Sequence, residues 1–82
     1  MELLEVYTMN NARRKKIQKT IDAIQEIASV LENILSEEEE AFENMPEGLQ
    51  ASDNGMASEE AQEALSDAVA ILEEAIECLE GI

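Results

Sequence analysis

Histidine and tryptophan are absent from this chain, which also has only one cysteine, one proline, one tyrosine and one phenylalanine. Without histidine, the chain lacks the commonest transition-metal ligand and the usual general base. The lone cysteine, Cys78, cannot form a disulfide within the chain, which favours a reducing compartment such as the cytoplasm. We expect Cys78 to act as a small buried or half-buried apolar side chain. Two aromatic residues are too few to form a base-stacking surface for nucleic acid.

Long apolar runs are missing as well. The first eight residues hold two acids and no apolar stretch long enough for a signal peptide or a membrane span. We expect residues 1–9 to form an N-terminal arm, because chain ends are poorly ordered unless something holds them. Asn10 or Asn11 is the expected cap of a first helix, since a short polar side chain accepts hydrogen bonds from the free amides of the first turn.

Positive charge is scarce. Five basic residues stand against twenty acidic ones, which gives a net charge of −15 over 82 residues. A surface this negative repels phosphate backbones and anionic membranes, so we expect neither as a direct partner. A protein partner with a basic surface fits better. Apolar residues make up 45% of the chain and recur at regular spacing, which favours packed helices over disorder.

The regular spacing is clearest between Ile17 and Met45. Steps of four and three reach an apolar residue at eight of nine positions, and Glu38 is the exception. This heptad pattern predicts one long helix over about residues 11–44. Pro46 ends that helix, because the residue before a proline is pushed out of the helical conformation. The first seam consists of Ile17, Ile21, Ile24, Ala28, Leu31, Leu35, Glu38, Phe42 and Met45.

A second seam follows a linker that we expect over residues 45–57, where Asp53-Asn54-Gly55 is a strong turn signal. Ser58 is the expected N-cap of a second helix over about residues 58–80, and Gly81 ends it. Alanine alternates with leucine along this helix, which lets two helices approach closely. The second seam consists of Ala61, Leu65, Ala68, Leu72, Ala75, Leu79 and Ile82.

Charge predicts how the two helices are oriented. All five bases lie between Arg13 and Lys19, where the dipole of their own helix disfavours cations. An antiparallel hairpin offsets this by bringing the bases near four glutamates at the end of the second helix. Those glutamates are Glu73, Glu74, Glu77 and Glu80.

The apolar stripe is broader than two helices can cover. Large exposed apolar patches mark interfaces, so we expect a homodimer that forms a four-helix bundle, with a trimer as the alternative. The predicted fold is therefore all-α, an antiparallel two-helix hairpin that dimerises. The residues assigned to the core and dimer seam are Ile17, Ile21, Ile24, Ile27, Leu31, Ile34, Leu35, Phe42, Leu65, Val69, Leu72, Ile76 and Leu79.

No pattern of catalytic or metal-binding residues emerges. A calcium-binding loop with Gly55 at its sixth position would begin at Gln50 and end at Ala61, which cannot ligate as that motif requires. A di-metal carboxylate centre needs Glu-x-x-His pairs, and histidine is absent. We therefore expect no cofactor, no metal ion and no enzymatic activity.

The densest charge on the chain offers a candidate partner-binding surface. It is either a solvated face that keeps the protein soluble or a surface that imitates the phosphates of a nucleic acid and occupies a basic groove on another protein. The candidate partner-binding residues are Glu37, Glu38, Glu39, Glu40, Glu43, Glu47, Met45 and Leu49.

Two stretches are distinctive beyond their helical pattern. One begins at Met9 and reads Met-Asn-Asn-Ala-Arg-Arg-Lys-Lys-Ile, and the other spans residues 37–52 with Phe-Glu-Asn-Met-Pro-Glu-Gly-Leu-Gln at its centre. Together with the Ala/Leu/Glu-rich second helix, they resemble small acidic helical proteins of unknown function encoded by bacteriophages and prophages. The resemblance covers about residues 9–82 and implies a bacterial host. It makes the loop motif a candidate partner contact and implies no activity.

Three hypotheses for the function follow. The first is a non-enzymatic phage or prophage accessory protein that acts by protein–protein interaction, for example as an inhibitor of a host protein. The second is an acidic DNA mimic that blocks a nucleic-acid-binding or defence protein. The third is a structural or assembly module with no partner beyond itself. Steep loss of the partner with added salt separates the second from the first.

Overall fold

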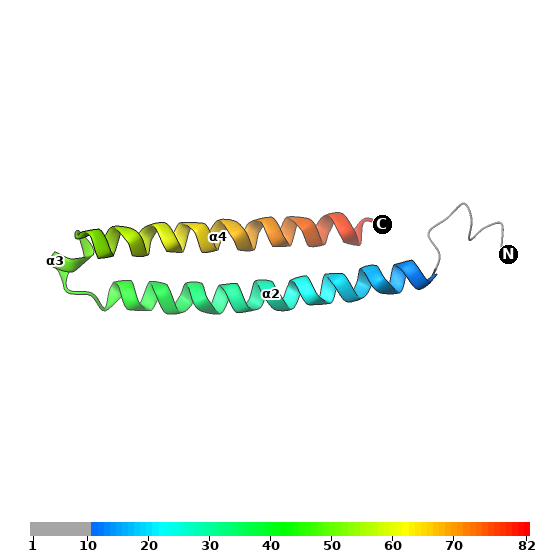
Figure 1. Ribbon diagram of the computed structural model, residues 1–82, viewed down its shortest axis with the longest axis horizontal. Helices are drawn as coiled ribbons and strands as arrows, with labels where there is room; N and C mark the ends of the chain where they lie inside the picture. The colour runs from blue at the N-terminus through cyan, green and yellow to red at the C-terminus, as the bar shows by residue number, and fades with distance from the viewer. Residues whose placement is uncertain (1–10) are drawn as a thin grey trace.

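The computed structural model describes residues 11–82, and these residues are helical with short turns between the helices (Figure 1). The helices are α2 (Asn11–Glu43), α3 (Glu47–Gln50) and α4 (Asp53–Glu80). No strand occurs among the described residues, so the prediction of an all-α fold is confirmed. The expected N-terminal arm and the candidate cap Asn10 lie outside the described residues.

Helix α2 is long because nothing in its sequence interrupts it. Residues 11–43 contain neither glycine nor proline and are rich in alanine, isoleucine, lysine and glutamate, most of which favour or tolerate a helix. At 1.5 Å per residue its 33 residues span about 50 Å. The helix ends just before Pro46, where Asn44 N donates to the Glu40 carbonyl (3.0 Å) and Met45 N donates to the Phe42 carbonyl (3.1 Å).

Helix α4 begins at Asp53, so the predicted linker over residues 45–57 and the predicted start at Ser58 are wrong. Four residues of that linker form α3, and Ser52 is the N-cap of α4, with an extended backbone (φ −82°, ψ 175°). The Asp53-Asn54-Gly55 sequence does not form a loop turn, because all three residues belong to α4. Asp53 instead occupies the first turn of α4, where the helix dipole favours an acid.

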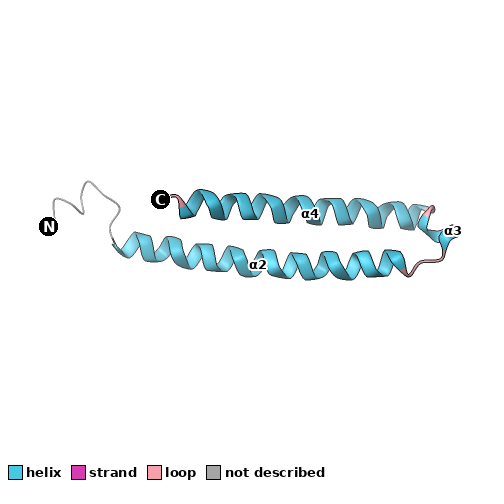
Figure 2. Ribbon diagram, turned by 180° about the vertical axis from the view of Figure 1, so that it is seen from behind, coloured by secondary structure: helices cyan, strands magenta, loops and turns pink. Residues whose placement is uncertain are grey.

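Helices α2 and α4 lie side by side, and α3 connects them at one end (Figures 1 and 2). Two hydrogen bonds show that the helices run in opposite directions. Near the α3 end, Ser58 Oγ donates to Glu38 Oε2 (3.0 Å). At the other end, Arg14 Nη1 donates to the Ile82 carbonyl oxygen (3.4 Å). Among the described residues, Lys15, Lys16 and Lys19 form no ion pair with the glutamates of α4.

The side chains of α2 that turn away from solvent are those of the first seam. Ile21 and Ala28 are buried, the other seam positions of the helix are half-buried, and the remaining residues of α2 are exposed. The core therefore follows the heptad positions along the whole helix. Burial is nevertheless modest, because no side chain of the described residues is less than 2% exposed.

The residues beside the two seams differ in exposure. Val69 and Ile76 are buried within one chain, whereas Ile27 and Ile34 are 53% and 42% exposed. All four were assigned to the core and dimer seam. Val69 and Ile76 each follow a small seam residue, Ala68 or Ala75, and small residues leave room for the next side chain to close over α2. The prediction for Cys78 is also wrong, because its side chain is exposed.

Candidate functional site

The turn between α2 and α4 is held by a side chain that the sequence analysis did not single out. Gln50 is half-buried, and its Nε2 donates to the carbonyl oxygens of Phe42 (3.0 Å) and Met45 (3.3 Å). These carbonyls lie at the C-terminal end of α2, where helical partners run out. The distinctive motif of residues 42–50 therefore closes on itself, and Gln50 is a structural cap.

Gly55 makes the same turn possible. A Cβ atom on Gly55 would lie 2.0 Å from the Gln50 carbonyl oxygen, whereas a Cβ atom on Gly48 would have no atom within 4 Å. Gly55 is also buried. Only a residue without a side chain allows α4 to start against the backbone of α3 in this way. The backbone at the start of α4 therefore packs directly against the backbone of α3. The turn signal in the sequence does not predict this contact.

Among the acidic candidate residues, one holds the two long helices together and the others are exposed to solvent. Glu38 is half-buried and accepts the hydrogen bond of Ser58, which is only 6% exposed. Ser58 was expected to cap a helix and instead ties α4 to α2. The exposed acids form a group that we call the acidic turn end. Its members are Glu37, Glu39, Glu40, Glu43 and Glu47.

Two exposed apolar side chains stand beside the acidic turn end. Leu49 is 49% exposed and Met56 is 56% exposed, and Met45 is half-buried. Ser52 connects the first two, because its amide donates to the Leu49 carbonyl (3.1 Å) and its own carbonyl accepts from Met56 N (2.9 Å). Apolar side chains inside a polar rim are typical of protein interfaces.

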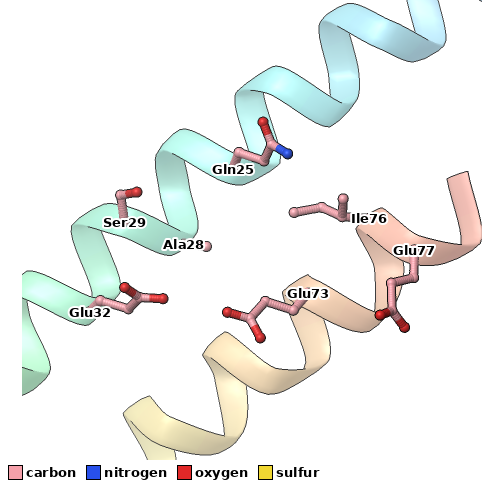
Figure 3. Close-up of a pocket in the computed structure, with 7 residues that line it drawn as sticks. All are labelled: Gln25, Ala28, Ser29, Glu32, Glu73, Ile76 and Glu77. Carbon is pink, nitrogen blue, oxygen red and sulfur yellow. The ribbon is translucent and has the colours of Figure 1, made fainter. Parts of the chain in front are cut away.

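A shallow groove of about 400 Å³ lies on one flank of the helix pair (Figure 3). Ala28 and Ile76 contribute its apolar lining, and the side chains of Glu32 and Glu73 extend toward one another across it. Gln25, Ser29 and Glu77 complete the lining. The described residues contain no group of three or more acids or cysteines that could hold a metal ion.

The opposite flank of the pair carries exposed aliphatic side chains beside three exposed acids of α4, which are Glu60, Asp67 and Glu74. Ile27 and Ile34 each precede a seam residue of α2, and Ile71 precedes the seam residue Leu72 of α4. The groove is lined by residues that follow seam positions, such as Gln25 and Ile76, so residues that precede seam positions share the other side. Val30 lies between Ile27 and Ile34 at helical spacing. We call Ile27, Val30, Ile34 and Ile71 the aliphatic flank, and they are 53%, 52%, 42% and 64% exposed.

Comparison of the chain with protein-family models, with curated proteins and with solved structures finds no match. Within residues 11–82, neither long helix has the apolar stretch that crossing a membrane requires. Two surfaces stand out by their exposed side chains, the acidic turn end and the aliphatic flank.

Proposed function

We propose that this chain is a non-enzymatic accessory protein of the phage or prophage type, which folds as a helical hairpin and acts by binding other proteins in the bacterial cytoplasm. The observation that carries the proposal is the acidic turn end with Leu49 and Met56 exposed beside it. Carboxylates steer a basic partner toward this surface. The apolar side chains then provide contacts that exclude water.

The experiment is capture of partners by a tagged chain from bacterial extracts. Leu49→Ser combined with Met56→Ser keeps every carboxylate and removes the apolar contacts. We expect this variant to lose the protein that the unchanged chain retains. A matched control is Ile82→Ser, which removes an exposed apolar side chain at the other end of the helix pair. Equal recovery of the same partner by the unchanged chain and the Leu49/Met56 variant would contradict the proposal.

The acidic DNA mimic is the second candidate, and the exposure of all five residues of the acidic turn end favours it. A mimic depends on charge, so its partner should be released steeply between low and moderate salt. Apolar contacts release their partner far less over the same range. Washing the captured complex at rising salt therefore separates the two candidates, and recovery of the chain alone supports a purely structural module.

A further inference from the structure

The start of α4 contains a dipeptide with a chemistry of its own. Asn54 is exposed, and it is followed by Gly55, which is buried. The backbone nitrogen of a glycine can attack the side-chain amide carbon of a preceding asparagine, because glycine has no side chain to obstruct the approach. A bond forms between Gly55 N and Asn54 Cγ, the bond from Cγ to Nδ2 breaks, and ammonia leaves with the proton of the Gly55 amide. Solvent water then opens the five-membered succinimide ring to aspartate or to isoaspartate.

The other asparagines of the chain are less suited to this reaction. Of the five asparagines in the sequence, only Asn54 precedes a glycine. Asn33 precedes Ile34 and Asn44 precedes Met45, so a bulky side chain stands beside each attacking nitrogen. Asn54 is therefore the asparagine at which ring closure meets the least obstruction in the unfolded chain.

The helical backbone of α4 holds the reaction back. The ring closes only when Asn54 Cβ and Gly55 N are nearly eclipsed about the Cα–C bond of Asn54, and a helical ψ of about −42° keeps the two atoms well apart. Both residues belong to α4, and Gly55 has no positive φ. Ring closure therefore requires the ψ angle of Asn54 to leave the helical region.

Two backbone contacts oppose that rotation. Met56 N donates to the Ser52 carbonyl oxygen (2.9 Å), which closes the first turn of α4. The Gly55 backbone lies so close to Gln50 that a Cβ atom would be 2.0 Å from the Gln50 carbonyl oxygen. Rotation about the Cα–C bond of Asn54 moves Gly55 and Met56 together, so it must break the hydrogen bond and lift Gly55 away from Gln50. The first turn of α4 therefore has to open before the ring can close.

The isoaspartate product does not fit the closed turn. Its backbone passes through the former side chain of Asn54 and contains one more carbon atom, which lengthens the chain by about 1.5 Å. The extra atom comes directly before Gly55, whose contact with Gln50 leaves no room even for a Cβ atom. The aspartate product keeps the ordinary backbone, and the helix dipole favours an acid in the first turn. Only isoaspartate therefore prevents the turn from closing.

We propose that Asn54-Gly55 is a site of spontaneous deamidation that is gated by the first turn of α4. The closed turn protects the site, the reaction proceeds when the turn opens, and the isoaspartate product then keeps the turn from closing again. Leu49 and Met56 stand on either side of this dipeptide, so the modification also displaces the exposed apolar side chains beside the acidic turn end. The inference goes beyond the proposed function and does not depend on it, because the reaction requires only the chain and water.

The first test compares the rate of modification in the folded and the unfolded chain. The purified chain is kept in buffer and in concentrated guanidinium chloride at the same mildly alkaline pH and the same temperature. Cleavage after Glu47 and Glu59 by a glutamate-specific protease releases the peptide 48–59, whose mass and isoaspartate content follow the reaction. We expect the rate to be about tenfold or more higher in the unfolded chain, because a protected site reacts only in the open state. A smaller ratio would overturn the proposal.

The second test locates the gate. Gln50→Ala removes the hydrogen bonds that hold the turn to the end of α2, and Ile76→Val trims a buried side chain far from the turn. Both changes weaken the fold, but only the first loosens the turn. We expect Gln50→Ala to raise the rate in buffer by about tenfold and Ile76→Val to raise it by less than about threefold. Circular dichroism verifies that both variants are helical under these conditions, and equal rates in the two would contradict a gate at the turn.

The third test concerns the product. A chain synthesised with isoaspartate at position 54 is compared with Asn54→Asp, which has the same charge and an ordinary backbone. We expect the isoaspartyl chain to lose helix content and to unfold at a lower urea concentration, whereas Asn54→Asp should unfold like the unchanged chain. Equal unfolding midpoints for the two chains would refute the effect of the product. All three tests use the purified chain alone, so capture by the Leu49/Met56 variant reports separately on the proposed function.

Discussion

Gly55 and Gly48 both lie at the turn, but their surroundings differ sharply. The missing Cβ of Gly55 makes room for the backbone of Gln50, whereas open space surrounds Gly48. We expect Gly55→Ala to lower the free energy of unfolding by about 2–3 kcal/mol, because the contact is with backbone that cannot easily move. Gly48→Ala should raise the free energy of unfolding by less than about 1 kcal/mol, since alanine is the better helix former. Urea unfolding of both variants measures this difference, and equal midpoints would contradict it.

Gln50 provides a second test at the same scale. Its amide donates to two carbonyls at the end of α2, and Gln50→Glu replaces the donor with a carboxylate that can only accept. We expect a loss of roughly 2–3 kcal/mol in the free energy of unfolding, because two carbonyls lose their partner and face a negative charge. Gln25→Glu, which adds the same charge at an exposed position of α2, is the control. Thermal unfolding followed by circular dichroism compares the two variants.

A limit of sequence analysis is visible in these residues. Gln50, Gly55 and Ser58 were read as loop, turn and cap, and the structure uses them for contacts with the backbone of α2, the backbone of Gln50 and the carboxylate of Glu38. Each role depends on a residue at the far side of a turn. Local propensity carries no information about such contacts.

The seam of α2 could be predicted because helix geometry alone decides which residues share a face. Burial along α2 follows the heptad positions from Ile17 to Phe42. In α4 the most buried side chains are Val69 and Ile76, which stand beside the seam positions, because the rotation of that helix depends on how closely Ala68 and Ala75 let it approach α2. Heptad counting gives the direction of a face but not the separation of two helices.

The helix pair itself yields a prediction about α4. Ile76 is 8% exposed within one chain and Ile71 is 64% exposed. We expect Ile76→Ala to lower the free energy of unfolding by about 2–3 kcal/mol, and Ile71→Ala to lower it by less than about 1 kcal/mol. Denaturant unfolding of both variants at the same protein concentration makes the comparison. Similar losses in both variants would show that Ile76 is not part of the core of one chain.

At the scale of the whole molecule, stability should depend on protein concentration. A ligand that binds only the folded state stabilises it by mass action, and in the homodimer expected from the sequence that ligand is a second copy. We expect the thermal midpoint to rise with each tenfold increase in concentration. A variant with Ile27→Gln and Ile34→Gln, which changes two exposed side chains of the expected dimer seam, should unfold at the same temperature throughout. A concentration-independent midpoint for the unchanged chain would contradict the expected homodimer.

The close approach of Gly55 to Gln50 also fixes the rotational phase of α4. Each residue added to a helix advances it by about 100°, so a single inserted residue before α4 would swing a different face toward α2. Ile71 lies roughly 24 Å farther along the helix. The direction in which its side chain points is nevertheless set at the first turn of α4. The absence of a side chain at Gly55 therefore determines which face of α4 is exposed to solvent.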